Sequence, residues 1–243
     1  MIPTRLDLFF SKLERRDAIS PEEREALLGA AGHETDIPAG QDLVREGDRP
    51  DRSTLVVSGF TTRYRVLGDG QRQITALHVP GDFVDLHSFV LKEMDHSVGA
   101  LSNCRVIYFP HSALTVITER FPHLTRVLWL MTLLDGAIHR EWLVAMGRRS
   151  AGGQLAHLVC ELYVRLGIVG LAQDQSFSIP LTQVELADAL GISAVHVNRV
   201  LQELRGENLL TWQNQVIHIL DWSRLQERAE FDPRYLHLEK LPR

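Results

Sequence analysis

The chain has 243 residues, which suits one large domain or two small ones, and either is long enough to bury a core. Hydrophobic residues make up 44% and charged residues 23%, so disorder is not expected as the main state. The net charge of −5 gives no basic bulk that would itself indicate nucleic-acid binding. The longest apolar run, at residues 127–134, is far shorter than the ~18 residues of a membrane span. We expect a cytoplasmic protein with no membrane partner.

The two cysteines, Cys104 and Cys160, form no CxxC pair and no zinc set, and they exclude a disulfide framework. Cys160 lies in the apolar run LAHLVCELYV and is expected to be a small buried residue.

Two helical segments are expected within residues 4–31. In the first, Leu6, Phe9, Phe10 and Leu13 recur at helical spacing. The second begins at Ser20-Pro21, which offers an N-cap and a first-turn proline.

From about residue 34 to 109, short runs rich in β-branched and aromatic residues alternate with glycine turns. This pattern predicts a small β-sandwich or barrel.

A helix is expected after His111, and Phe121-Pro122 ends it and begins a long helix to about Gly147. Counting heptads places a coiled-coil seam at Leu124, Val127, Met131, Leu134, Ile138, Glu141 and Ala145. Apolar residues outside this seam require cover on more than one side, by the β-domain and by a second copy of the chain. A buried core helix in a monomer is the alternative. Residues 148–153 resemble a hinge, and a further helix is expected to end at Gly167.

Residues 182–206 are the most informative stretch. Thr182 and Glu185 form a TxxE capping box, and Val184, Leu186, Ala187 and Leu190 can supply the inner face of a short helix. Gly191 can make the turn, and Ser193 can cap a second helix. Two short helices joined in this way form a helix-turn-helix.

The second helix has two distinct faces. Val197, Val200, Leu201 and Leu204 share one side, and the opposite side carries Val195, Asn198, Arg199 and Gln202. Arginine, asparagine, glutamine and small apolar side chains are the types that read base edges in the major groove. Any amphipathic helix exposes polar residues, however, so this pattern alone leaves an ordinary solvated face open.

The whole arrangement resembles the Crp/Fnr-type bacterial transcription regulators. The resemblance rests on LTQxELADALGIS…VNRxL at residues 181–201 and on roll segments such as Ser58-Gly59 and Pro80-Gly81-Asp82-Phe83. It implies an α+β fold with an N-terminal double-stranded β-roll, a long dimerisation helix and a C-terminal winged helix-turn-helix. The expected domains are residues 1–121 with the N-terminal helices and sensor roll, residues 122–149 with the dimerisation helix and hinge, and residues 150–243 with the DNA-binding domain.

The resemblance also implies DNA contacts. Arg199 matches the family's guanine-reading arginine and Asn198 a position that often contacts a base, whereas Val195 replaces a glutamate. The phosphate-positioning candidates are Thr182, Gln183, Ser193 and His196. The stretch TWQNQVIHIL suits a two-stranded wing with its turn at Gln213-Asn214. Residues 150–243 contain 8 Lys and Arg against 11 Asp and Glu, so we expect a modest salt dependence of DNA binding.

The cyclic-nucleotide members hold ribose with a glutamate and phosphate with an arginine followed by serine or threonine. Here the glutamate position falls on Leu86, or on Asp85 if the register slips by one, and the arginine position falls on His96 before Ser97. An imidazole cannot replace a bidentate guanidinium contact, so tight binding of cyclic AMP is not expected. The effector-pocket candidates are Asp85, Leu86, His87, Ser88, His96 and Ser97.

No cofactor is expected, although an unknown small-molecule effector can occupy the roll. The family's iron–sulfur sensors need four cysteines, which this chain lacks. His78, His87 and His96 recur every nine residues, which leaves a metal site in the roll open without favouring it.

The sequence therefore predicts a non-enzymatic homodimeric regulator that binds double-stranded palindromic DNA, with RNA polymerase as an expected partner. The alternatives are a metal- or small-molecule-binding roll whose helical domain is accessory, and a cyclic-nucleotide receptor that does not bind DNA.

Overall fold

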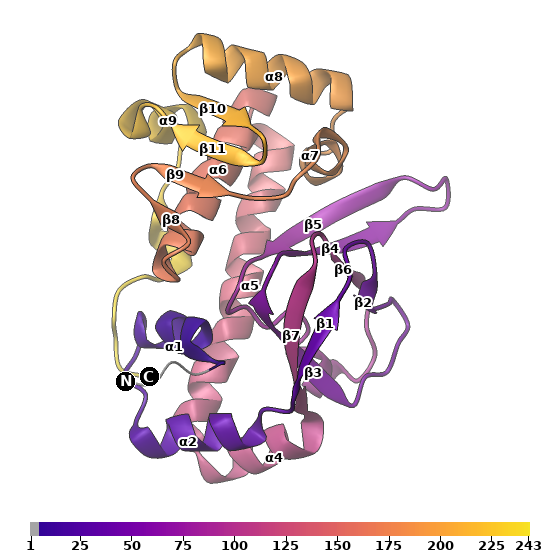
Figure 1. The fold of residues 1–243 in the computed structure, drawn as a ribbon, viewed down its shortest axis with the longest axis vertical. Helices are drawn as coiled ribbons and strands as arrows, with labels where there is room; N and C mark the ends of the chain where they lie inside the picture. The colour runs from indigo at the N-terminus through magenta and orange to yellow at the C-terminus, as the bar shows by residue number, and fades with distance from the viewer. Residues whose placement is uncertain (1–4) are drawn as a thin grey trace. The chain divides into compact units, whose positions relative to one another are not determined.

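The computed structural model describes residues 5–243 and divides the chain into two compact units (Figure 1). Unit 1 holds the chain up to residue 65, residues 77–136 and residues 237–243. Unit 2 holds residues 66–76 and 137–236. The boundaries between the two units fall inside two strands and one helix.

Two short helices begin unit 1, α1 (Asp7–Glu14) and α2 (Pro21–Ala30). The predicted start of α2 is confirmed. The Ser20 hydroxyl accepts a hydrogen bond from the Glu23 amide at 3.2 Å, and the Glu23 carboxylate accepts one from the Ser20 amide at 2.9 Å. This reciprocal pair satisfies two amides that would otherwise lack partners at the helix end.

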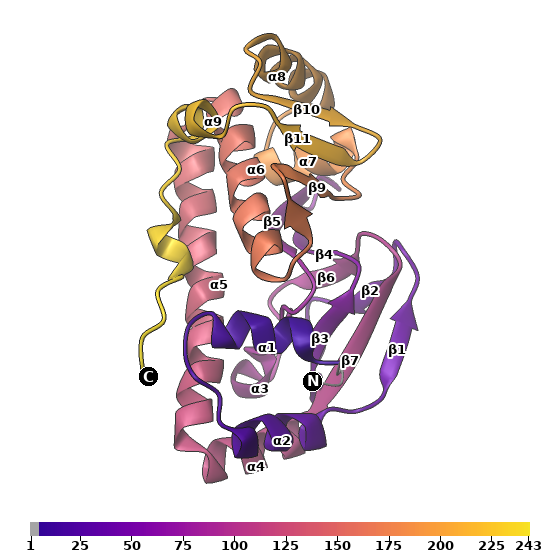
Figure 2. The same cartoon turned by 60° about the vertical axis from the view of Figure 1, so that its left-hand side comes forward.

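The body of unit 1 is a β-roll of two sheets, seen from a second side in Figure 2. One sheet has the strand order β1-β7-β3 and the other has the order β2-β6-β4-β5. The strands are β1 (Glu34–Ile37), β2 (Asp42–Val44), β3 (Arg52–Ser58), β4 (Thr61–Val66), β5 (Arg72–His78), β6 (Ser97–Ala100) and β7 (Cys104–Pro110). Five of them match runs predicted from sequence. The other two, β1 (ETDI) and β6 (SVGA), each contain two residues of types that are depleted in strands.

Gly59 makes the sharp turn between β3 and β4, with a φ of +86°. A Cβ at this position would lie 2.5 Å from the Asn103 carbonyl oxygen and 2.8 Å from the Cys104 sulfur. Glycine is therefore required both by the left-handed backbone and by the close approach of a neighbouring segment.

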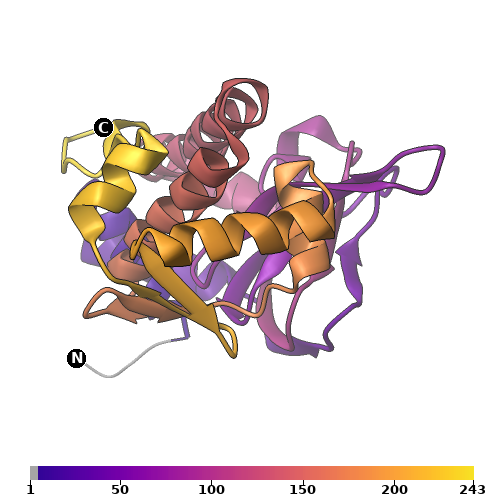
Figure 3. The same ribbon diagram turned by 90° about the horizontal axis from the view of Figure 1, so that it is seen from above.

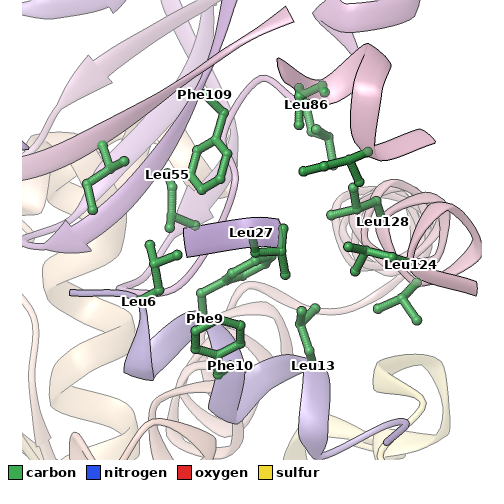
Figure 4. Packing of buried hydrophobic residues seen from close by; sticks show 14 residues of the cluster. Leu6, Phe9, Phe10, Leu13, Leu27, Leu55, Leu86, Phe109, Leu124 and Leu128 are labelled. Atoms are coloured by element: carbon green, nitrogen blue, oxygen red, sulfur yellow. The ribbon is translucent and has the colours of Figure 1, made fainter. Parts of the chain in front are cut away.

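The main apolar core of unit 1 joins the two N-terminal helices, the roll and the first half of the long helix α5 (Pro122–Arg148) (Figure 4). The Phe83 ring contacts Phe9 and Phe109 edge-on, with centroids 5.2 and 5.0 Å apart. Leu124 and Leu128 of α5 face this cluster in Figure 4. Two shorter helices complete the unit, α3 (Ser88–Leu91) and α4 (His111–Arg120). The predicted break at Phe121-Pro122 is confirmed.

Unit 2 places helices around a small sheet of order β10-β11-β9-β8. Its elements after α5 are α6 (Ala151–Ile168), β8 (Ala172–Gln173), β9 (Ser176–Ser178), α7 (Gln183–Leu190), α8 (Ala194–Gly206), β10 (Leu210–Gln213), β11 (Val216–Ile219), α9 (Trp222–Ala229) and the 3-10 helix η1 (Pro233–Leu236). Seen from above in Figure 3, the orange helix α8 runs across the front of this unit.

The end of α6 differs from the prediction. Gly167 lies inside the helix, and the left-handed residue is Gly170, with a φ of +72°. The Leu171 amide donates to the Leu166 carbonyl at 2.9 Å, and the Gly170 amide donates to the Gly167 carbonyl at 3.1 Å. These two bonds form a Schellman motif, in which Gly170 and not Gly167 is the left-handed residue that ends the helix.

A buried carboxylate ties unit 2 together. Glu161 of α6 accepts hydrogen bonds from the Arg165 guanidinium at 2.9 Å, the Tyr235 hydroxyl at 2.9 Å and the Trp142 indole at 3.3 Å. Burial raises the pKa of Glu161, and the three donors oppose that shift. The network joins the second half of α5, α6 and η1.

Among residues 5–243, no helix is both long and apolar enough to cross a bilayer.

Candidate nucleic-acid interface and effector pocket

The helix-turn-helix of α7 and α8 is built as its capping residues predict. The Thr182 hydroxyl accepts from the Glu185 amide at 3.2 Å, and the Glu185 carboxylate accepts from the Thr182 amide at 2.7 Å. Gly191 ends α7 with a φ of +66°, and the Ser193 hydroxyl accepts from the His196 amide at 3.2 Å. Both helix starts and the turn between them therefore have a local cause in the sequence.

The inner face of α7 carries Leu186, Ala187 and Leu190, as expected. Val184 does not belong to it, because its side chain is exposed. At 100° per residue Val184 lies nearly opposite Leu186, and Ala189 takes the remaining buried position.

The two faces of α8 separate as predicted. Val197, Val200 and Leu204 are buried, and the exposed side carries Val195, Asn198, Arg199 and Gln202. Val195 is 76% exposed, a costly position for an apolar side chain that has no partner. A shallow hollow beside the start of α8 is lined by Gln183, Ala194, Val195, Asn198 and Arg199. Asn198, Arg199 and Gln183 of α7 therefore share one surface.

The phosphate candidates divide into two kinds. The Thr182 hydroxyl donates to the Glu185 carboxylate at 2.7 Å, so both its hydrogen and its oxygen are committed to the cap. Gln183 and Ser193 are exposed, and His196 is half-buried. Gln183 is the candidate whose side chain faces the hollow.

The wing is present, but its turn lies one residue later than predicted. Gln213 pairs with Val216 across β10 and β11, so the two turn residues are Asn214 and Gln215. Their φ values are +50° and +67°, the left-handed pair that matches the twist of a two-residue hairpin. The sheet is also wider than predicted, because β9 pairs with β11.

The pocket candidates of the roll do not all face one space. The Asp85 carboxylate is buried and accepts from the Thr54 amide at 2.5 Å and the Thr54 hydroxyl at 3.0 Å. Burial raises the pKa of Asp85 to about 7, against the opposing effect of these bonds. Leu86 lies in the apolar core, and the buried Ser88 hydroxyl is 3.4 Å from the His111 ring. The Ser97 hydroxyl accepts from the Glu46 amide at 3.1 Å.

His87 and His96 do come together, with ring centroids 5.0 Å apart. Burial and the nearby Arg63 guanidinium lower the pKa of His87, and burial lowers the pKa of His96 to about 4. Both imidazoles are therefore neutral at pH 7. Arg63 lies beside them and donates to the Asp135 carboxylate at 2.7 Å and to the Val84 carbonyl at 3.2 Å.

Comparison with known families finds both halves of this arrangement. Residues 34–121 match the cyclic nucleotide-binding domain, and residues 153–228 match the Crp-like helix-turn-helix domain. The chain is 28% identical over 214 residues to the transcriptional activator protein FnrL of Cereibacter sphaeroides, which covers 86% of each chain. It is 27% identical over 218 residues to the nitrogen fixation regulation protein FixK of Bradyrhizobium diazoefficiens, covering 88% of this chain and 87% of the relative.

The chain therefore carries the two domains of a Crp/Fnr-type transcription regulator, the cyclic nucleotide-binding domain and the Crp-like helix-turn-helix domain. The crystal structure of FixK2 from Bradyrhizobium japonicum has the same fold, with a TM-score of 0.76 at 24% identity, covering 83% of this chain and 98% of that one. The predicted β-roll, long helix and winged helix-turn-helix are thereby confirmed. The chain is a DNA-binding transcription regulator of the Crp/Fnr type.

The Crp/Fnr positions expected to hold a cyclic nucleotide are altered in this chain. Leu86 offers no hydrogen bond to a ribose, and Asp85 is engaged with Thr54. His96 stands at the phosphate position, and the sequence has no arginine between Arg72 and Arg105. The guanidinium that lies near the pocket is that of Arg63, which is engaged with Asp135. The residues present therefore do not fit the contacts that the family resemblance implies.

Both cysteines of this chain are buried, and burial raises the pKa of each thiol. Cys104 lies in unit 1 and Cys160 in unit 2. A protonated buried thiol is a poor nucleophile and a poor metal ligand. The cysteines therefore behave as packing residues.

The predicted dimer seam of α5 is wrong at its N-terminal end. Leu124 and Val127 belong to the core of their own chain, and Leu134 and Ala145 are also buried. Met131, Ile138 and Glu141 are half-buried, and Glu141 accepts from Arg149 at 3.3 Å. The exposed large apolar residues of α5 are instead Trp129, Leu133, Leu143, Val144 and Met146, and the first four share a face about 100° wide. The heptad count identified a row of apolar side chains, but most of them pack against other residues of their own chain.

The sequence reading missed Arg63, Asp95 and Asp135. Asp95 could have been noticed as a carboxylate directly before His96. Arg63 and Asp135 lie 72 residues apart in the chain, and their pairing needs the fold. His78, the third histidine of the nine-residue spacing, is not part of this cluster, and its ring lies 3.2 Å from the Thr61 hydroxyl.

Proposed function

We propose that the chain acts as a homodimer and reads a palindromic DNA site with α8 of each subunit. The observation that carries this is the separation of the α8 faces, with Val195, Asn198, Arg199 and Gln202 all exposed opposite a buried apolar face. Arg199 donates to guanine, and Asn198 and Gln202 pair with adenine in the usual way. Gln183, Ser193 and His196 position the phosphate backbone, whereas Thr182 acts through its cap.

Affinity for the phosphate backbone rests on few charges. Residues 150–243 carry 8 Lys and Arg against 11 Asp and Glu, so helix N-termini and polar side chains must supply much of the contact. Non-specific binding is accordingly weak, and base reading contributes a large share of the affinity.

The second copy of the chain covers the exposed face of α5. In unit 1 this face carries Trp129 and Leu133, next to an apolar hollow of about 520 Å³ that is lined by Leu86, His87 and residues of α3, α4 and α5. A patch of this kind on a soluble protein marks an interface, and a two-fold dimer brings the same patch of each copy together. Crp/Fnr regulators are dimers, which supports a second copy of the chain as the partner that covers this face.

We divide the chain functionally into residues 1–121 as sensor, 122–149 as dimerisation helix with its hinge, and 150–243 as DNA-binding domain. A signal in the roll shifts the population between two dimer arrangements through α5 and the segment at 148–153. RNA polymerase is the expected partner at the promoter and the cytoplasm the expected place of action. The signal is not cyclic AMP, and calorimetry with cyclic AMP should show no binding at micromolar concentrations.

In-vitro selection of random duplexes by the purified full-length chain tests the function, at a stated salt concentration. A two-fold palindrome with half-sites about 34 Å apart is the expected result. Enrichment of a single non-repeated site would reject the homodimeric reading mode. A variant carrying Arg199→Ala and Asn198→Ala together should lose the enrichment, and an Arg224→Ala control on α9 should keep it.

A further inference from the structure

Two neighbouring imidazole rings of the roll each carry a buried nitrogen that has no hydrogen-bond partner among residues 5–243. These nitrogens are Nε2 of His87, at the start of α3, and Nε2 of His96, just before β6. Buried polar atoms are normally satisfied, so a pair of them in neighbouring rings points to a ligand from outside the chain.

A carboxylate completes the cluster. His87, Asp95 and His96 each offer one ligand atom, and these atoms lie within 4.8 Å of one another. Ligand atoms around a tetrahedral ion with bonds of about 2.0 Å lie roughly 3.4 Å apart, so modest side-chain rotations close the set. Asp95 is free to make them, because its side chain is 75% exposed.

The hydrogen bond between Asp95 and His96 also favours a metal. The Asp95 carboxylate lies 2.6 Å from Nδ1 of His96 and holds the proton on that nitrogen. The lone pair of His96 is then on Nε2, the atom that has no partner. When an ion binds Nε2, the Asp95 carboxylate must leave Nδ1 to become a ligand, because Nδ1 and Nε2 point to opposite sides of the ring.

We propose that His87 and His96, together with Asp95, bind one first-row divalent transition-metal ion in the β-roll. Two imidazoles and a carboxylate suit ions such as Zn²⁺ or Fe²⁺ and leave further coordination positions open. An anion is disfavoured, because the Asp95 carboxylate repels it and the nearby Arg63 already binds Asp135 and the Val84 carbonyl. This inference concerns the roll alone and holds whether or not the DNA-reading proposal is correct.

The test uses the full-length chain after chelator treatment and dialysis. Titration with Co²⁺, whose visible absorption reports ligand type, should saturate at one ion per chain. Competition with Zn²⁺ should displace the Co²⁺ spectrum. Absence of saturable binding in the wild-type chain overturns the proposal.

Three variants and one control assign the ligands. His87→Gln and His96→Gln should each weaken binding at least 10-fold, and Asp95→Asn should weaken it less strongly. Asp95→Asn changes an exposed side chain, so it keeps the test informative if either histidine variant fails to fold. His111→Gln, another histidine of unit 1 but outside the cluster, should bind Co²⁺ like the wild type. Binding that survives Asp95→Asn and both histidine changes unaltered overturns the assignment.

An anion arm separates the two ligand classes. Calorimetric titration of the metal-free chain with inorganic phosphate should show no binding. Phosphate binding that is lost in His96→Gln would identify an anion pocket and overturn the metal proposal.

Discussion

In the proposed function, Arg199 is the side chain on which base reading should depend most. It lies on the exposed face of α8 beside Asn198, and a guanidinium can donate two bonds to one guanine. Arg199→Ala should therefore cost about 1–3 kcal/mol of specific affinity and relax the guanine preference at one position of the half-site. Fluorescence anisotropy with the selected duplex and its single-base variants measures both effects. Arg224→Ala removes the same charge from α9, and an equal loss of specificity there would show that Arg199 acts only through its charge.

His123 is a residue whose role the sequence did not reveal. Its ring lies 2.6 Å from the Glu23 carboxylate and 3.1 Å from the Asp17 carboxylate, linking α5 to the N-terminal segment. The bond to Glu23, aided by Asp17, raises the pKa of His123 against the effect of burial. Burial tends to raise the pKa of Asp17 and of Glu23, but bonds from His123 and nearby amides outweigh it and lower both.

The pH dependence of this triad follows from those directions. The raised pKa of His123 gives stability that is full below about pH 6.5 and is lost as the pH rises through the folded-state pKa. The lowered pKa values of the carboxylates give stability that is full above about pH 4 and is lost at lower pH. His123→Gln should therefore cost most, about 1 kcal/mol, near pH 5–6 and less above pH 7. Urea unfolding from pH 4 to 8 measures this, with the exposed His33→Gln as control, and a loss independent of pH would contradict it.

The residues of the roll show what sequence reasoning can and cannot reach. The positions of His87 and His96 followed from the resemblance, and both histidines do lie together. Their surroundings did not follow, because Arg63 comes from β4 and Asp135 from α5. Spacing along the chain cannot predict a pairing that depends on how a strand and a distant helix meet.

Among the elements, those with strong local end signals were predictable. The starts of α2, α7 and α8 each rest on a side-chain cap that can be read directly from the sequence. Very short strands such as β8 and β9 carry no such signal, since their pairing partners lie elsewhere in the chain. The long helix α5 is apolar on several sides, so a heptad count cannot tell the side that meets its own roll from the side that meets a partner.

The wing turn allows a stability test at the level of one element. Asn214 and Gln215 both adopt the left-handed conformation, which strains a side chain such as glutamine. Gln215→Gly should therefore stabilise the chain by about 0.5–1 kcal/mol, and Gln213→Gly, in the strand β10, should destabilise it by a similar amount. Thermal unfolding of both variants decides this, and a loss of stability in Gln215→Gly would argue against the observed turn.

At the scale of the whole molecule, the exposed apolar face of α5 is the feature most in need of cover. Trp129 is 64% exposed and Leu133 is 54% exposed. Leu133→Glu should raise the dimer dissociation constant at least about 10-fold, because a two-fold axis brings like charges from both copies to one interface. Sedimentation equilibrium over a range of concentrations measures this. Val116→Glu adds the same charge to α4 and should leave the dimer intact, and a dimer unaffected by Leu133→Glu would place the interface elsewhere.

The placement of the tryptophans should give the proposed dimer an optical signature. Of the four tryptophans in the chain, Trp129 is largely exposed in a single subunit and Trp142 is buried against Glu161. An indole emits at longer wavelength in water than in an apolar setting, so Trp129 should shift to the blue as subunits associate while Trp142 stays constant. Association can then be followed by intrinsic fluorescence upon dilution, and Trp129→Phe should abolish the shift.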